Sequence, residues 1–175
     1  MIKETDYLIV GAGAMAMSFA DTILKEQPNS TIALVEKRSA PGGHWLDAYP
    51  YVRLHQPASF YGVNSEKLET HSGDLSSKQE ILAYYSRVLY RMENAGRVKF
   101  FGMMEHTGKG NVRSIVDPNK KIKFRIKKRL VDSTYMKVEV PSTTRPNFEV
   151  SKNVNLVPPN HLFSLSAGYD RYNII

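Results

Sequence analysis

The chain has 175 residues, of which 42% are hydrophobic and 23% charged, with a formal net charge of +7. This composition is typical of a single soluble globular domain, and no apolar run approaches the roughly 20 residues that a membrane-spanning helix needs. The absence of cysteine excludes disulfides, thiolate metal sites and cysteine nucleophiles. The first residues are too acidic for a secretory signal, so we expect a cytoplasmic protein.

The first forty residues predict a strand, a helix and a second strand. Tyr7–Val10 is a short apolar run, as expected of a strand that is buried on both faces. A helical apolar pattern follows from residue 13 to about residue 25, and Thr31–Val35 is a second buried strand. The handedness of such crossovers predicts a parallel sheet for this β-α-β unit, which spans residues 1–40.

A glycine fingerprint lies between the first strand and the helix. Gly11-x-Gly13-x-x-Ala16 has the spacing and the context of a dinucleotide-binding loop, in which the third glycine is replaced by alanine. The unpaired N–H groups at the start of the helix favour a diphosphate. Glu36 ends the second strand 23 residues after Gly13, where its carboxylate can accept hydrogen bonds from ribose hydroxyls. This acid disfavours a 2′-phosphate, and therefore NADP, at this first site.

The remaining chain divides into a long loop, a helix, a set of strands and a tail. Residues 41–74 are rich in glycine and proline, and a loop of this length is uncommon in a domain unless it is functional. A capping box at Ser77–Glu80 and the glycine at position 96 predict a helix over 77–95. Residues 97–140 are predicted to form an antiparallel β-meander, with strands at 98–101, 112–116, 122–126 and 135–140. Residues 141–175 are predicted to be an irregular tail.

The excess positive charge is concentrated between residues 97 and 129, which hold eleven Lys or Arg and two acids. Much of it lies at residues 121–127, where cations alternate with Ile122, Phe124 and Ile126. This period of two is typical of a strand with one buried and one solvated face. No nucleic-acid motif accompanies the charge, so we expect neither a nucleic-acid nor a membrane partner.

The loop after Glu36 contains two further motifs. Gly42-Gly43-His44-Trp45 is followed by a segment at positions 49–57 that reads Tyr-Pro-x-x-Arg-Leu-His-Gln-Pro. With the fingerprint, these motifs resemble the flavin-containing monooxygenases and related FAD/NAD(P)-dependent oxidoreductases over nearly the whole chain. The resemblance implies a Rossmann-like α/β fold that carries an antiparallel meander and binds FAD.

The resemblance also implies a role for each matching position. The FAD pyrophosphate would face Gly11, Gly13, Ala14 and Met15, beside Ala16 of the fingerprint. The adenosine ribose would contact Glu36, and the adenine would contact Lys37 and the backbone of Met104. The flavin end would be lined by Gly43 and Trp45, and the isoalloxazine ring would lie near Arg53 and Gln56. Gln56 falls where these monooxygenases usually have asparagine. No catalytic residue is assigned, and neither His44 nor His55 has the spacing of a metal pair, so no metal site is predicted.

Asp170–Ile175 echoes the residues before the first glycines, at the place where the related enzymes begin a second Rossmann domain for NADPH. We therefore interpret the chain as the FAD-binding portion of an FAD- and NADPH-dependent, monooxygenase-like oxidoreductase that acts on a small molecule. We expect it to be inactive alone and to self-associate through the surface that the second domain would cover.

Two other classes of function stay open. In the first, the chain is an NAD(H)-binding Rossmann protein without flavin, and the paired glycines at 42 and 43 form only a turn. In the second, it is a non-catalytic assembly module that keeps the FAD-binding fold.

Overall fold

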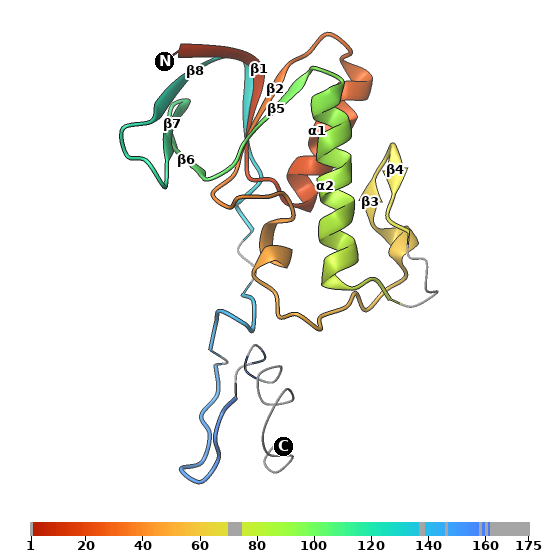
Figure 1. Ribbon diagram of the computed structural model, residues 1–175, viewed down its shortest axis with the longest axis vertical. Coiled ribbons are helices and arrows are strands. Elements are labelled where there is room, and N and C mark those ends of the chain that lie inside the picture. The colour runs from red at the N-terminus through yellow and green to blue at the C-terminus, as the bar shows by residue number, and fades with distance from the viewer. Residues whose placement is uncertain are drawn as a thin grey trace.

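A computed structural model describes residues 2–69, 75–136, 139–145, 147–157, 159 and 161. Strand β1 (Ile2–Val10) is flanked on both sides by parallel partners, β2 (Ile32–Val35) and β8 (Lys121–Asp132). Within the described residues, six strands form one sheet in the order β5-β2-β1-β8-β7-β6 (Figure 1). The parallel β-α-β opening and the mixed α/β class expected from the sequence are both confirmed.

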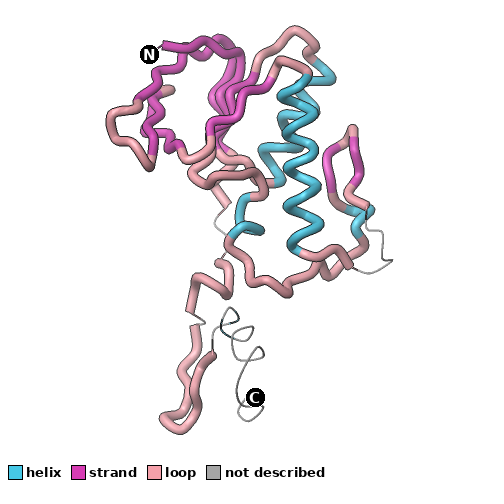
Figure 2. The backbone as a smooth tube through the Cα atoms, viewed as in Figure 1, coloured by secondary structure: helices cyan, strands magenta, loops and turns pink. Residues whose placement is uncertain are grey.

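Helices α1 (Ala14–Glu26) and α2 (Lys78–Asn94) cover one face of this sheet (Figure 2). The larger core lies between them and the sheet, and joins Ile9 and Leu34 of the strands to Met17 of α1 and Val88 of α2. The predicted capping box is present at the start of α2, where Ser77 and Glu80 bond reciprocally. Gly96 follows the helix with φ +75°, a conformation that glycine adopts without strain.

The opposite face of the sheet is covered by the meander curling over it. Strands β6 (Met104–Gly108), β7 (Asn111–Ser114) and β8 pair antiparallel in sequence order. A smaller core lies inside this curl, where Leu8 packs with Val112, Ile122 and Phe124. The alternating segment at 121–127 therefore buries Ile122 and Phe124 as predicted, whereas Ile126 is only partly buried.

The meander differs from the prediction at both of its ends. Strand β5 (Val98–Phe101) pairs parallel with β2, so assigning it to the meander was wrong. Its partly buried Phe100 packs against the larger core and Phe101 against the smaller one, so both faces of this edge strand are partly covered, as is typical of parallel sheets. At the other end, β8 continues to Asp132 along β1, and residues 135, 136, 139 and 140 form no strand, while residues 137 and 138 lie outside the described range.

The described part of the loop over residues 41–74 contains only short elements. These are the 3-10 turns η1 (Gly43–Leu46) and η2 (Ala58–Phe60) and the two-residue strands β3 (Gly62–Val63) and β4 (Glu66–Lys67). The β3–β4 hairpin is fastened to the helices: Asp21 of α1 accepts from the N–H of Ser65, and the Tyr84 hydroxyl of α2 donates to the Glu66 carbonyl. Residues 70–74 of the predicted loop lie outside the described range.

The tail runs away from the sheet and helices (blue in Figure 1). Residues 141–145 and 147–157 hold no helix or strand, whereas residues 159 and 161 are helical. The echo at Asp170–Ile175 lies outside the described residues.

Candidate dinucleotide site

The glycine loop joins the end of β1 to the start of α1. The N–H of Gly11 donates to the carbonyl of Val35 at 2.8 Å, and Gly11 has φ +97°. A Cβ at this position would lie 2.7 Å from Ser133 Oγ and 2.9 Å from Thr134 Cγ2. Both the backbone conformation and the crowding therefore require glycine at position 11.

The first turn of α1 is open to an anion. Gly13 is the N-cap and has no side chain to bond the first helical N–H groups, and the first turn contains no acidic residue. Ala14 and Met15 are exposed, whereas Ala16 is fully buried. Because the first N–H groups of a helix lack partners within the helix, this turn presents donors and a positive dipole end to a diphosphate.

The second pair of glycines packs directly on the first loop. The N–H of Gly42 donates to the carbonyl of Ala12 at 2.9 Å. Gly43 has φ +58°, and a Cβ on it would lie 3.0 Å from the Cα of Gly13. The two glycine segments, which the resemblance assigns to the pyrophosphate and to the flavin end of FAD, therefore meet backbone to backbone.

Glu36 is buried, with 4% of its surface exposed, and its carboxylate points at the glycine loop. Oε2 accepts from the N–H of Ala12 at 2.7 Å, and Oε1 accepts from the N–H of Arg38 at 3.0 Å. Each carboxylate oxygen has two lone pairs, so Oε2 keeps capacity for one more donor. In this structure Glu36, the residue predicted to bind the ribose, therefore holds the glycine loop in shape.

Arg38 connects this acid to the turn at the flavin end. Its guanidinium lies 3.4 Å from Glu36 Oε1 and binds the carboxylate of Asp47 through two nitrogens. Both the Asp47 and the Glu36 carboxylates raise the pKa of Arg38, the hydrogen bond to Asp47 most strongly. Lys37, by contrast, is exposed and pairs with Glu105 at 3.2 Å, on the side where Met104 begins β6.

The predicted flavin-end residues lie in and after η1. Trp45 is half-buried against the larger core, and its ring stacks on His44 with centroids 5.5 Å apart. Burial, and next the charge of Arg38, lower the pKa of His44, while Asp47 acts in the opposite direction. Arg53 and Gln56 are exposed: Arg53 donates to the carbonyl of Leu75 at 2.9 Å, and Gln56 accepts from the Tyr61 hydroxyl at 2.7 Å.

Met104 is brought to the predicted adenosine end. It is 3% exposed, and its N–H donates to the carbonyl of Glu36 at 2.9 Å. It begins β6, the second strand after α2.

The sequence reasoning missed Ser133 and Thr134, which follow β8. Both the N–H and the Oγ of Ser133 bond the carbonyl of Val10, at 3.0 and 2.6 Å, and the pair lies over Gly11. The only local signal was three polar residues, Asp132 to Thr134, directly after an apolar pair. Their place beside the glycine loop follows from the parallel pairing of β1 with β8, which the local pattern does not encode.

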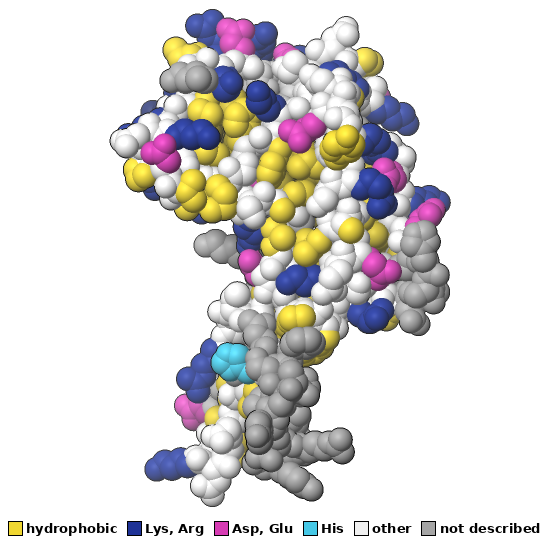
Figure 3. Space-filling view, viewed as in Figure 1, with side chains coloured by type: hydrophobic (Ala, Val, Ile, Leu, Met, Phe, Trp, Pro, Cys, Tyr) yellow, Lys and Arg dark blue, Asp and Glu magenta, His cyan; other side chains and the backbone are white. Residues whose placement is uncertain are grey.

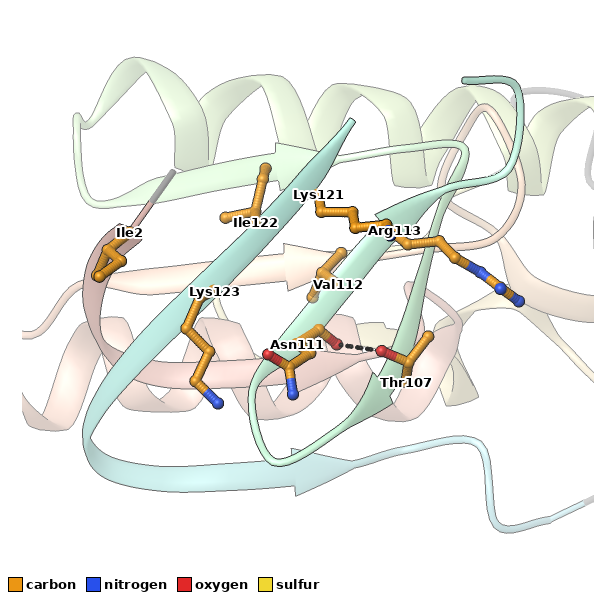
Figure 4. Close-up of a pocket in the computed structure, with 8 residues that line it drawn as sticks. All are labelled: Ile2, Thr107, Asn111, Val112, Arg113, Lys121, Ile122 and Lys123. Carbon is orange, nitrogen blue, oxygen red and sulfur yellow. Dashed lines mark hydrogen bonds between the residues drawn. The ribbon is translucent and has the colours of Figure 1, made fainter. Parts of the chain in front are cut away.

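A pocket of about 480 Å³ lies elsewhere, on the meander (Figure 4). Its walls come from the start of β1 and from β6, β7 and β8: Ile2, Thr107, Asn111, Val112, Arg113, Lys121, Ile122 and Lys123. The glycine loop follows the opposite end of the nine-residue strand β1. Two of its cations are already bonded, Arg113 to Glu105 and Lys123 to the carbonyl of Lys109. None of the predicted site residues lines it.

Three cations of the basic stretch form ion pairs in this structure. Arg125 and Lys127 both bind Glu4, and Arg113 binds Glu105. On the face that Figure 3 shows, Lys and Arg side chains are scattered among apolar and polar surface. Across the described ranges, no cluster of His, Asp or Glu has the geometry of a metal site, and no helix has the length and apolar character needed to cross a membrane.

Comparison with known proteins gives relatives in sequence and in structure. No family model matches the chain. An uncharacterized protein of Mycobacterium tuberculosis is 38% identical over 98% of this chain, which spans 33% of that protein. The probable FAD-binding monooxygenase AlmA of Acinetobacter baylyi is 31% identical over 57% of this chain and 20% of its own length.

Solved structures share the fold. A flavin-containing monooxygenase from Stenotrophomonas maltophilia superposes with a TM-score of 0.55 and 19% identity, over 75% of this chain and 38% of that one. The bacillithiol disulfide reductase of Staphylococcus aureus gives a TM-score of 0.57 at 12% identity, over the same 75% of this chain and 38% of its own. A steroid monooxygenase bound to NADP gives 0.52 at 23% identity, over 75% and 26%.

The chain therefore has a mixed α/β fold of Rossmann type. It is the fold of the FAD-binding part of flavin monooxygenases and related FAD-dependent oxidoreductases. The chain spans about a third of the length of the mycobacterial relatives that it matches.

Proposed function

We propose that this chain binds FAD and forms the FAD-binding portion of a monooxygenase-like oxidoreductase that takes its electrons from NADPH. The observation that carries the proposal is the contact between Gly13 and Gly43, which sets the flavin-side turn at the open end of α1. A single ligand that runs from the glycine loop past this contact would touch both motifs. FAD has the required parts, a diphosphate in the middle and a ring system at each end.

The residues of the site fit FAD at three points. The uncapped N–H groups of the first turn of α1 would bind the diphosphate. Glu36 has a free lone pair on Oε2 for a ribose hydroxyl. Gly43 and Trp45 would line the flavin end, where the flavin would supply the two-electron chemistry while the protein binds and orients it.

The electron source is proposed to act through segments outside this chain. The Glu36 carboxylate disfavours a 2′-phosphate at the first site, so we place NADPH elsewhere in the complete enzyme. The chain alone is then expected to oxidise NADPH far more slowly than a complete flavoenzyme does. Steady-state NADPH oxidation followed at 340 nm in the presence of FAD measures this.

The first experiment is the visible spectrum of the purified chain, with chromatography of any ligand released on denaturation, followed by titration with FAD. We expect FAD to be released or taken up. A chain that takes up NADH but no FAD would contradict the proposal and favour an NAD(H)-binding protein.

A substitution at the glycine loop tests where the ligand lies. In Gly13→Ser the new hydroxyl would cap α1 and occupy the N–H groups proposed for the diphosphate. The added Cβ lies at an ordinary distance, 3.5 Å from the nearest atom, so the fold should be as stable or more stable. We expect FAD to bind at least about tenfold more weakly, a loss of ~1.4 kcal/mol.

Ala83→Ser is the matched control, because it adds a hydroxyl at an exposed position of α2, outside the glycine loop. It should leave FAD affinity unchanged. Equal FAD affinity in Gly13→Ser and Ala83→Ser would contradict the placement of the diphosphate at α1.

A further inference from the structure

The first turn of α2 holds the irregular segment that follows Trp45. Lys78 donates through Nζ to the carbonyls of Leu46, at 3.1 Å, and Ala48, and its N–H donates to the carbonyl of Val52 at 3.0 Å. Gln79 Nε2 donates to the carbonyl of Pro50 at 3.2 Å. Four alternate carbonyls of a segment without regular structure therefore receive their hydrogen bonds from two adjacent residues of one helix.

The same segment is held from the opposite side. Arg38 binds the side chain of Asp47, and Ser142 Oγ donates to the Asp47 carbonyl. Leu82, one turn further along α2, fills the space where a Cβ on Gly42 would lie, with Cδ2 2.5 Å from that position. The turn that carries Gly43 and Trp45 thus lies between an anchor at Gly42 and an anchor at residues 46–48.

Lys78 stands where a helix disfavours it. It is the first residue of α2, where the helix dipole favours acidic side chains and opposes a cation. It is also half-buried, which costs an ammonium group part of its hydration. A cation in this unfavourable position is expected to stabilise a part of the structure other than its own helix. The part that Lys78 contacts is the loop, where it bonds the two carbonyls that flank Asp47.

We infer that Lys78 is a positioning residue for the flavin end of the site, and this inference rests on the function proposed above. By holding the carbonyls of Leu46 and Ala48, it keeps the Gly43–Trp45 turn against Gly13 before any ligand is present. Such preorganisation raises affinity because less of the binding free energy is spent on ordering the loop. Its effect should be confined to ligands that reach the flavin end.

The test compares two ligands on three variants of the chain. Lys78→Met keeps the length of the stem and removes the donors, Lys78→Arg keeps a cationic donor, and Lys99→Met makes the same change at an exposed position of β5. Dissociation constants for FAD and for ADP are measured on each by titration. ADP carries the diphosphate and adenosine but no flavin, so it reports the glycine loop alone.

We expect Lys78→Met to weaken FAD binding about tenfold, ~1.4 kcal/mol, and to leave ADP affinity within about twofold. Lys78→Arg should recover most of the FAD affinity, and Lys99→Met should match the parent chain. Equal losses for FAD and ADP, or no loss for either, would overturn the inference.

Trp45 supplies a readout that needs no ligand, because it is the only tryptophan in the chain. In Lys78→Met the freed turn should expose it, which shifts its emission to the red and increases quenching by acrylamide. If the parent chain takes up no FAD, the proposed function fails and this readout still decides the positioning role. Emission and quenching unchanged from the parent would then overturn that role.

Discussion

The two ends of the candidate site are built in different ways. The adenosine end consists of β1, α1 and β2, and its loop is held by backbone contacts and by one buried carboxylate, Glu36. The flavin end is a segment with two short 3-10 turns, held by side chains that reach in from elsewhere, chiefly Arg38 and Lys78. The adenosine end is fixed by the pairing and packing of its own strands and helix. The flavin end depends for its shape on side chains of residues that lie outside the segment.

This difference has a consequence for stability and for binding. Substitutions that remove the buried contacts of the adenosine end, such as those of Glu36, disturb the sheet and its loop and should destabilise the whole domain. Substitutions at the anchors of the flavin end free a surface segment, and such segments open locally at a lower cost than the global free energy of unfolding. Four predictions test this contrast, from the largest expected effect to the smallest.

Glu36→Ala should give the largest loss of stability. The Ala12 N–H, in a residue with no exposed surface, would lose its acceptor, and Arg38 would lose one of its two carboxylate partners. An unsatisfied buried donor together with a lost charged hydrogen bond costs about 3 kcal/mol. Urea unfolding followed by far-UV circular dichroism measures it.

Lys37→Ala is the control for this change, because it removes the neighbouring exposed side chain and should alter the free energy of unfolding by less than ~0.5 kcal/mol. Similar midpoints for Glu36→Ala and Lys37→Ala would show that Glu36 does not hold the loop.

The two facing glycines should respond unequally to alanine. Gly43→Ala places a Cβ 3.0 Å from the Cα of Gly13 at φ +58°, so we expect a loss of about 2 kcal/mol from left-handed strain and crowding. Gly13→Ala meets its nearest atom at 3.5 Å with φ −81°, and should cost less than ~1 kcal/mol. The pair serves as its own control in urea unfolding. Equal losses would mean that the two loops are not in contact in solution.

Tyr85 tests the part of α2 that packs on the core rather than on the loop. Burial, with a smaller contribution from Tyr84, raises its pKa to about 12. In the unfolded chain a tyrosine titrates near pH 10, so the unfolded state loses its proton first and stability falls between about pH 10 and 12. At pH 10.5 the loss should be about 1 kcal/mol. It should be smaller in Tyr85→Phe, in which the buried Tyr84, whose pKa burial also raises, remains, as measured by urea unfolding at pH 8 and 10.5.

An equal alkaline loss in Tyr85→Phe and the parent chain would contradict this assignment. The exposed Tyr90→Phe is the control on the same helix, and it should keep the full loss.

The sequence predicted the adenosine end better than the flavin end because the information for each has a different range. Gly11, Gly13 and Ala16 lie within six residues, and the strand and helix around them have clear periods, so a local pattern was sufficient. The pairing of β8 with β1, the place of Ser133 over Gly11 and the parallel pairing of β5 all join residues far apart in the chain, and no local period encodes them.

The flavin-side motifs were recognised by resemblance, whereas the side chains that hold them in place were not predicted. Nothing in the spacing of Lys78 or Arg38 indicates that their side chains reach the carbonyls or the carboxylate of residues 46–48. Glu36 was assigned to a ribose, and its second task, holding the Ala12 N–H, could not be anticipated, because it depends on the rotamer chosen in the folded loop.

The smallest effect concerns His44, which reports the charge balance at the flavin-end turn. Burial is the main cause of its lowered pKa and the charge of Arg38 the second, whereas Asp47 opposes both. Arg38→Met removes a positive charge and frees Asp47 from its ion pair, so the pKa of His44 should rise toward its ordinary value. The ring stacks on Trp45, so the pH dependence of the single tryptophan's emission follows this titration.

Lys37→Met is the matched control, because Lys37 precedes Arg38 but pairs with Glu105 instead. It should leave the titration of His44 unchanged. Since the folded state lowers this pKa, the unfolded state takes up the proton first, and His44 should reduce stability as the pH falls below about 6.5. In Arg38→Met that acid sensitivity should be smaller. A pKa of His44 that stays unchanged or falls in Arg38→Met would mean that Arg38 does not lie beside the turn. Arg38 would then not connect the flavin end to Glu36 as described above.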